Sequence, residues 1–232
     1  MGIWSVKMKI ELMYKETPYV NVRTVDLVWR VQGDRTKNAL MKKDEAKWTY
    51  EAELESGEYY YKFRINNEFL LPDPMNNLFS FDENGNLWTL LIVGQDGIMQ
   101  YNSNFTIHLS EYCLLPIVTG RNVIASKRYY NVDLARQIVA RFRFDRITGI
   151  HMVTVVWCQP DKKMYSFSEH VLYEEEIKEE VTLWFELGLD EIRRKKILGI
   201  WYLKMFIDGE FILEDMFTIE KLRDRNSKNQ YV

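Results

Sequence analysis

Residues 57–73, GEYYYKFRINNEFLLPD, form the segment that decides the fold. Its first part, residues 59–65, is rich in aromatic residues, and successive side chains of an extended strand point to opposite faces. We expect one face to pack in the core, with Tyr61, Phe63 and Ile65, and the other to point outward, with Tyr60, Lys62 and Arg64. The dipeptide Asn66-Asn67 then favours a tight turn. The segment is therefore predicted to be a β-hairpin.

The same pattern recurs near the C-terminus. Residues 199–215 read GIWYLKMFIDGEFILED, and aligning them with residues 57–73 without a gap gives eight identical positions out of 17. The pair Asn66-Asn67 falls on Asp208-Gly209, which is a strong signal for a two-residue hairpin turn. The repeat therefore favours two domains of one architecture.

Short segments with alternating polarity cover most of the chain and predict strands. In the first half these segments are residues 6–14, 25–31, 48–54, 59–65 and 88–93. In the second half they are residues 105–109, 138–144, 151–158, 181–187, 199–207 and 211–219.

The turn-forming residues 94–97 indicate a domain boundary. We therefore predict a first domain at residues 1–96, a second at 97–222 and a polar tail at 223–232. Residues 131–140 and 174–180 are expected to form loops or short helical turns. The acidic run at 173–180 and the basic run at 193–196 together predict a charged surface hairpin or a weak patch for an anionic partner.

The overall composition narrows the class of protein. Of the 232 residues, 47% are hydrophobic and 28% are charged, which suits a chain that buries a core. The formal net charge of -3 gives no electrostatic reason to expect binding to nucleic acid. The chain contains no run of 18 or more apolar residues, which a membrane-spanning helix would need. Residues 1–7 lack the apolar stretch of a signal peptide. We therefore expect a cytoplasmic protein without membrane association.

The cysteines and histidines do not indicate a metal or catalytic centre. Cys113 and Cys158 have no metal-ligand spacing. A disulfide between them stays open, but their apolar surroundings favour buried free thiols. The three histidines share no metal motif, and the chain has neither a nucleophile elbow nor a phosphate-binding loop. We therefore predict a protein with no enzymatic activity, no metal and no cofactor.

Residues 25–93 resemble carbohydrate-binding module family 48. The resemblance rests on Trp48, on LESGEYYYKFRINN at 54–67, on Asp73-Pro74, and on NGNLW at 84–88 before a final strand. Such modules occur in the β subunit of AMP-activated protein kinase and beside branching and debranching enzymes, and the resemblance implies binding to an α-glucan such as glycogen or starch. The second half is similar to generic bacterial immunoglobulin-like domains. The predicted fold is all-β, with two tandem immunoglobulin-like, early-set β-sandwich domains.

The resemblance also implies a sugar site. Lys62 matches the sugar-contacting lysine of the family, and Phe69 matches a tryptophan that stacks on glucose. Trp88 lies in the closing loop, where the family places an amide residue that binds sugar. Tyr60, on the outward face beside Lys62, and Asn86, in the closing loop, complete the predicted set. A glucan presents apolar C–H faces and hydroxyl groups, so these side chains should lie exposed on one surface.

The pattern departs from the family after residues 25–31. The chain continues Val31-Gln32-Gly33-Asp34-Arg35, so Asp34 or Arg35 stands where the family has a second stacking tryptophan. The alternative interpretation is a structural or protein-interaction sandwich that has lost sugar binding. Such a protein would act as a homodimer or by docking to a partner protein.

Overall fold

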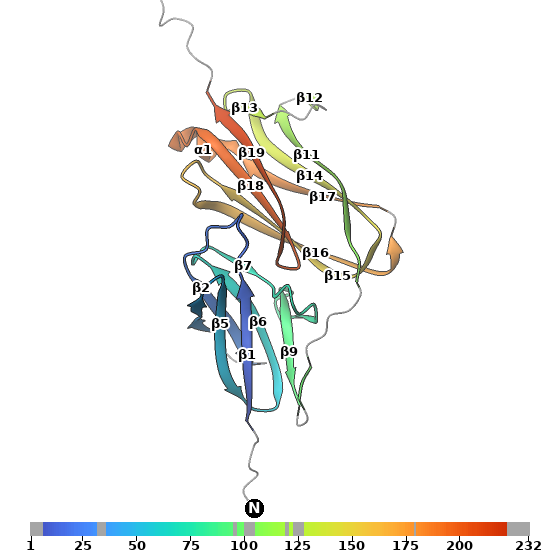
Figure 1. Cartoon of the computed structure of the whole chain (residues 1–232). Coiled ribbons are helices and arrows are strands. Elements are labelled where there is room, and N and C mark those ends of the chain that lie inside the picture. Colours follow the sequence, from blue (N-terminus) through green and yellow to red (C-terminus); the bar gives the residue numbers. More distant parts are fainter. Residues whose placement is uncertain are drawn as a thin grey trace, which may run out of the picture.

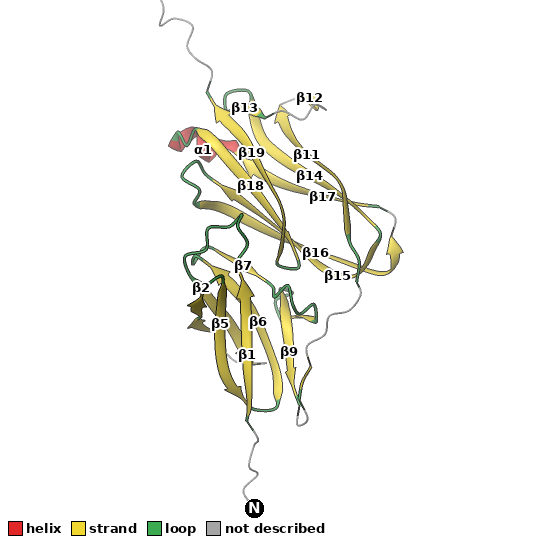
Figure 2. Cartoon of the chain, in the orientation of Figure 1, coloured by secondary structure: helices red, strands yellow, loops and turns green. Residues whose placement is uncertain are grey.

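The computed structural model describes residues 7–31, 36–94, 97–99, 105–118, 121–122, 128–178 and 180–221. Strands predominate, and they form two sandwiches arranged one after the other along the molecule (Figure 1). Among the described residues, helix is confined to one short segment of the second sandwich (Figure 2). The prediction of an all-β fold with two tandem sandwiches is confirmed.

The first sandwich packs a three-stranded sheet, in the order β1-β5-β4, against a seven-stranded sheet. The larger sheet has the order β10-β9-β6-β2-β3, and β7 and β8 pair with β6 and β9. The strands are β1 (Met8–Lys15), β2 (Val25–Val31), β3 (Lys37–Leu40), β4 (Lys42–Asp44), β5 (Lys47–Leu54), β6 (Gly57–Ile65), β7 (Phe69–Leu71), β8 (Phe79–Phe81), β9 (Leu87–Val93) and β10 (Ile98–Met99).

The second sandwich packs a four-stranded sheet, β12-β11-β14-β17, against a five-stranded sheet, β13-β19-β18-β15-β16. Its elements are β11 (His108–Val118), β12 (Arg121–Asn122), β13 (Tyr129–Asn131), β14 (Ala135–Asp145), β15 (Ile147–Cys158), β16 (Met164–Lys178), β17 (Val181–Gly188), α1 (Leu189–Lys195), β18 (Gly199–Ile207) and β19 (Glu210–Glu220).

The two repeated segments form equivalent hairpins. Asn66 and Asn67 both have positive φ, at 55° and 58°, and Asp208 and Gly209 have φ of 52° and 84°. Both turns thus have the backbone geometry that the turn dipeptides predicted. The alternation is also as predicted, because Tyr61, Phe63 and Ile65 are buried in the first core. In the second core Leu203, Met205 and Ile207 hold the corresponding positions.

The sandwiches meet at a junction that is continuous with the first core. Val156, Cys158 and Phe206 belong to the second sandwich but are buried in the same cluster as Phe63 and Phe69. The rings of Phe69 and Phe206 lie 5.8 Å apart between their centroids. Apolar packing of this kind, spread over strands of both sandwiches, fixes their relative orientation.

Two lysines cross the junction in opposite directions. Lys62 of the first sandwich contacts Glu169 of the second, with its Nζ 2.9 and 3.0 Å from the two carboxylate oxygens. Lys204 of the second sandwich donates a hydrogen bond of 2.6 Å to the carbonyl oxygen of Tyr19 in the first. Lys62 and Lys204 are equivalent residues of the two repeated hairpins, so each hairpin uses its outward lysine to hold the other sandwich.

Some predicted boundaries differ from the structure. The pair Ile98–Met99 forms β10 and pairs with β9, so the first sandwich extends past the boundary predicted after residue 96. Residues 131–140, expected as a loop, include the start of the long strand β14. The predicted tail at 223–232 lies outside the described residues. Cys113 and Cys158 are free thiols, as the apolar surroundings favoured.

The predicted charged hairpin is wrong. The acidic run continues β16, and the basic run belongs to α1. Helix α1 buries Leu189 and Ile192 in the second core and places Asp190 and Glu191 in its first turn. Two features of this segment are helix signals: its buried residues are three positions apart, and its first turn is acidic. The segment is nevertheless too short for a helical periodicity to stand out.

The tip of the β18–β19 hairpin offers a test of the junction. A Cβ atom on Gly209 would lie 2.2 Å from the carbonyl oxygen of Pro72 in the first sandwich, and Gly209 has φ of +84°. We expect Gly209→Ala to lower the free energy of unfolding by about 2–4 kcal/mol, because it adds backbone strain and pushes the hairpin away from Pro72. Urea denaturation measures the change.

Gly85→Ala is the matched control, because Gly85 has a similar φ of +79° but no atom within 4 Å of the added Cβ. In this variant the free energy of unfolding should fall by only roughly 1 kcal/mol, which is the cost of placing an alanine at positive φ. Equal losses in the two variants would mean that the hairpin tip does not hold the sandwiches together.

Candidate functional site

The structure buries most of the predicted sugar site. Lys62, Phe69, Tyr60 and Trp88 are 2%, 4%, 6% and 8% exposed, and only Asn86 is an exposed residue. Tyr60, Lys62 and Trp88 do gather on the outer face of the seven-stranded sheet, as the strand alternation predicted. Phe69 points to the opposite face and into the core. The expectation that these side chains form one exposed surface is therefore contradicted.

The second sandwich is one cause of this burial. The Lys62 ammonium group is held by Glu169 of β16, and it also lies 5.8 Å from the centroid of the Trp88 ring. Phe69 packs against Phe206. Sequence reasoning placed Lys62 on the outward face correctly, but a strand pattern in one domain carries no information about a second domain that covers that face.

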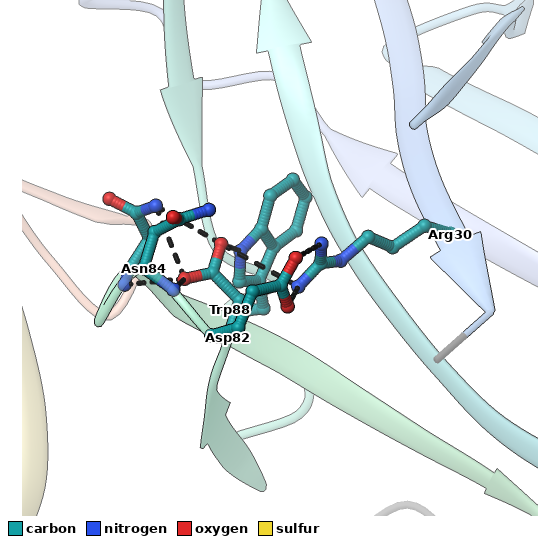
Figure 3. Close-up of polar contacts among 6 residues, drawn as sticks. Arg30, Asp82, Asn84 and Trp88 are labelled. Atoms are coloured by element: carbon teal, nitrogen blue, oxygen red, sulfur yellow. Dashed lines mark hydrogen bonds and ion pairs between the residues drawn. The ribbon is translucent and has the colours of Figure 1, made fainter. Parts of the chain in front are cut away.

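Arg30 and the segment between β8 and β9 cover Trp88 on the outer face (Figure 3). Arg30, from β2, lies 5.6 Å from the Tyr60 ring and 5.5 Å from the Trp88 ring, in cation–π geometry. Its guanidinium group donates two hydrogen bonds of 3.1 Å to the carboxylate of Glu83. The aromatic rings that would meet a sugar are thus occupied by an arginine of the same chain.

Asp82 organises this cover. One carboxylate oxygen accepts hydrogen bonds from the backbone N–H groups of Asn84 and Asn86, and the other accepts one of 2.9 Å from the Trp88 indole (Figure 3). The Asn86 amide also donates to this carboxylate, at 3.2 and 3.0 Å. Burial opposes the charged form, but these hydrogen bonds outweigh it, and the pKa of Asp82 falls to about 2. Asn86 is exposed, but its amide supports the loop.

A separate cavity lies at the junction, with a volume of about 520 Å³. Its walls come from residues 16–22 and Lys43, the β6–β7 hairpin and the second sandwich. The full set is Glu16, Thr17, Pro18, Tyr19, Val20, Asn21, Val22, Lys43, Asn66, Glu68, Phe69, Cys158, Lys162, Tyr202, Lys204 and Glu214. Phe69 is the one predicted site residue among them.

Tyr19 is the most exposed aromatic residue of this cavity. Its ring stacks on Phe211 of β19, with 4.7 Å between centroids and an angle of 10° between planes, yet the residue is 59% exposed. One face of the ring is therefore supported and the other is open. Lys204 donates a hydrogen bond to the Tyr19 carbonyl oxygen. The Asn66 side chain donates a hydrogen bond to the carbonyl oxygen of Asn21 and accepts hydrogen bonds from the backbone N–H groups of Arg23 and Thr24. These contacts fix the position of the segment.

Tyr19 has only a weak signal in the sequence. A proline before an aromatic residue, between two predicted strands, indicates a surface loop. The support from Phe211 comes from 192 positions further along the chain and requires both sandwiches to be in place.

The charged groups of the cavity balance. Three carboxylates, Glu16, Glu68 and Glu214, face three ammonium groups, Lys43, Lys162 and Lys204. A hydrogen bond from Lys43 and another from the Trp48 indole hold the pKa of Glu16 below its usual value, against the effect of burial. Lys162 lies 5.4 Å from the centroid of the Tyr202 ring.

The reactive side chains near the junction do not form a catalytic set. Burial raises the pKa of the Cys158 thiol to about 11, so the thiol is protonated at neutral pH. His151 lines a second cavity, of about 460 Å³, but is only 2% exposed. Its two ring nitrogens lie 2.6 Å from Asp208 and 3.0 Å from the Thr148 carbonyl oxygen, which marks it as a structural contact. Across the described residues, no group of three or more His, Cys, Asp or Glu side chains could hold a metal ion.

The structure bears in part on two other predictions from the sequence, the missing stacking tryptophan and the absence of a membrane span. Asp34 and Arg35, which replace the second stacking tryptophan, lie outside the described residues. In the part of the chain that the structure covers, no helix is long and apolar enough to cross a membrane.

Comparisons with known proteins find distant structural neighbours. An immunoglobulin-like protein from Pseudomonas aeruginosa is 12% identical over 51% of this chain and all of its own length, with a TM-score of 0.34. A maltogenic amylase from S. marinus is 13% identical over 94% of this chain and 30% of its own, with a TM-score of 0.32. A DUF3823 family protein from Parabacteroides merdae is 14% identical over 91% of this chain and 98% of its own, with a TM-score of 0.28. No family model and no curated protein sequence matches the chain.

The Asp82 cluster predicts a pH dependence. Because the folded-state pKa of about 2 lies below the ordinary aspartate pKa of 3.8, the charged carboxylate stabilises the fold above pH 4, and this contribution is lost as the pH falls toward 2. In urea denaturation between pH 2 and pH 7, Asp82→Asn should lower stability at neutral pH and remove part of the acid-induced loss.

Asp44→Asn, which changes an exposed carboxyl on β4, is the control. Its stability should depend on pH in the same way as that of the wild type. If Asp82→Asn matches the wild type at every pH, the carboxylate does not hold the loop over Trp88.

Proposed function

We propose that this chain is a non-catalytic α-glucan-binding protein whose sugar site is the junction cavity and not the outer face of the first sandwich. The observation that carries the proposal is the Tyr19 ring, which is supported on one face by Phe211 and open on the other. Small-molecule sites occur preferentially at domain interfaces, and the cavity volume of about 520 Å³ lies in their usual range.

The chemistry of a glucose unit suits this cavity. Its C–H face is apolar and can stack on an aromatic ring that is held flat, and its hydroxyl groups both donate and accept hydrogen bonds. Carboxylates such as Glu68 and Glu214 accept from hydroxyls, and ammonium groups such as Lys162 donate to them.

The balance of charge favours a neutral ligand. With three carboxylates and three ammonium groups in its wall, the cavity has no net attraction for an anion or a cation. A polyhydroxylated neutral molecule can use both kinds of group at once. The fixed position of Tyr19 lowers the entropy that is lost on binding, which matters for a weak ligand.

A second candidate function is that of a structural or protein-interaction module. The burial of Lys62, Phe69 and Trp88 favours it, because the face expected to bind sugar is used within the chain. The two functions differ in their response to glucan, so one experiment separates them.

Binding of maltoheptaose by isothermal titration calorimetry, with retention in native gels that contain glycogen, tests the site. We expect saturable binding with a dissociation constant on the order of 1 mM. In Tyr19→Ala the affinity should fall by at least about tenfold, which is equivalent to one stacking contact. Tyr173→Ala removes an equally exposed tyrosine of β16, away from the cavity, and should bind like the wild type.

The outcomes are distinct. Binding that survives Tyr19→Ala would move the site elsewhere and overturn the junction cavity. An absence of wild-type binding at 20 mM maltoheptaose, together with no retention by glycogen, would overturn the glucan function and leave the interaction module.

A further inference from the structure

The outer face of the five-stranded sheet is apolar beyond the area that the first sandwich covers. At one end of this face Val156, Cys158 and Phe206 are buried in the junction. At the other end Tyr129, Ile200 and Met216 are 68%, 52% and 57% exposed. We call these last three residues the distal patch.

Strand register shows that the distal patch is contiguous. Tyr129 of β13 and Ile200 of β18 both pair with Thr218 of β19, one on each side. Met216 lies two residues before Thr218 on the same strand, and it therefore points to the same face. Three neighbouring strands thus present large apolar side chains together, which is uncommon on an isolated soluble protein.

The distal patch continues directly into the junction. Tyr202 of β18 pairs with Met216 on one side and with Cys158 of β15 on the other. Cys158 is 4% exposed because the first sandwich covers it. One half of this face therefore already binds a β-sandwich, and the distal patch is its uncovered half.

We propose that the distal patch is a dimerisation surface that binds the distal patch of a second copy of this chain. Closed two-fold dimers are the commonest symmetric assemblies, and a two-fold axis needs a surface that is complementary to itself. An apolar patch without charged residues meets this condition, because no like charges are brought together.

The charges that border the distal patch fit the same arrangement. Glu220 lies beyond Thr218 on β19, at the end of the sheet far from the first sandwich. Lys162 lies over the Tyr202 ring, in the wall of the junction cavity. A copy rotated by a half-turn, with its strands antiparallel, brings the acidic end of one patch toward the basic end of the other.

Sedimentation equilibrium of the full chain, between about 1 and 100 µM, tests the proposal. We expect the apparent mass to rise with concentration toward twice the chain mass of 27.9 kDa. Ile200→Glu should weaken association by at least about 100-fold, because the two-fold axis places two buried, unpaired carboxylates in each interface. Ile200 is half exposed in the monomer, so the variant should unfold in urea like the wild type.

Leu40→Glu is the matched control. Leu40 is 66% exposed on β3 of the first sandwich, and the same substitution there should leave association unchanged. A wild type that stays at the mass of one chain at 100 µM would overturn the proposal, as would an Ile200→Glu variant that associates like the wild type. Growth of the mass beyond two chains would also overturn it, because an open-ended assembly requires two different surfaces.

Discussion

The contact between the two repeated hairpins is the constraint on which the rest of the structure depends. Phe69 of one hairpin packs against Phe206 of the other, and Gly209 lies against the Pro72 carbonyl with no room for a side chain. Lys62 and Lys204 then reach across in opposite directions. Breaking one buried charge contact leaves the partner unpaired at a cost of several kcal/mol, so the domain orientation and the polar contacts stabilise each other.

This junction removes one surface and creates another. It helps to bury the outer face of the first sandwich, where Lys62 and Trp88 would have met a sugar, and the Asp82 loop with Arg30 covers Trp88. It also brings Phe211 under Tyr19, which turns a residue of a surface loop into a fixed ring at the mouth of a cavity. The position of an aromatic residue in its own domain therefore does not decide whether it can bind a ligand.

The parts of the fold that sequence predicts are those that local chemistry controls. Strands β2 and β18 begin and end at the predicted residues, because alternating side chains and turn dipeptides act over a few positions. Helix α1 escaped prediction because seven residues span only two turns, and its basic run imitates a solvated loop. The burial of Lys62 escaped because Glu169 lies 107 positions away, and only tertiary structure brings the two together.

The outward faces of both sandwiches show why aromatic strands are ambiguous evidence for function. Such a face can bind a sugar, a neighbouring domain or a second chain, since each of these covers apolar area. The polar groups among the aromatic residues distinguish the three. Around Tyr19, balanced charges offer donors and acceptors to hydroxyl groups, whereas at the junction the ion pair of Lys62 with Glu169 ties two domains. Around Ile200 and Met216 the patch carries no charge, which suits contact with an identical surface and gives a hydroxylated ligand little to bond.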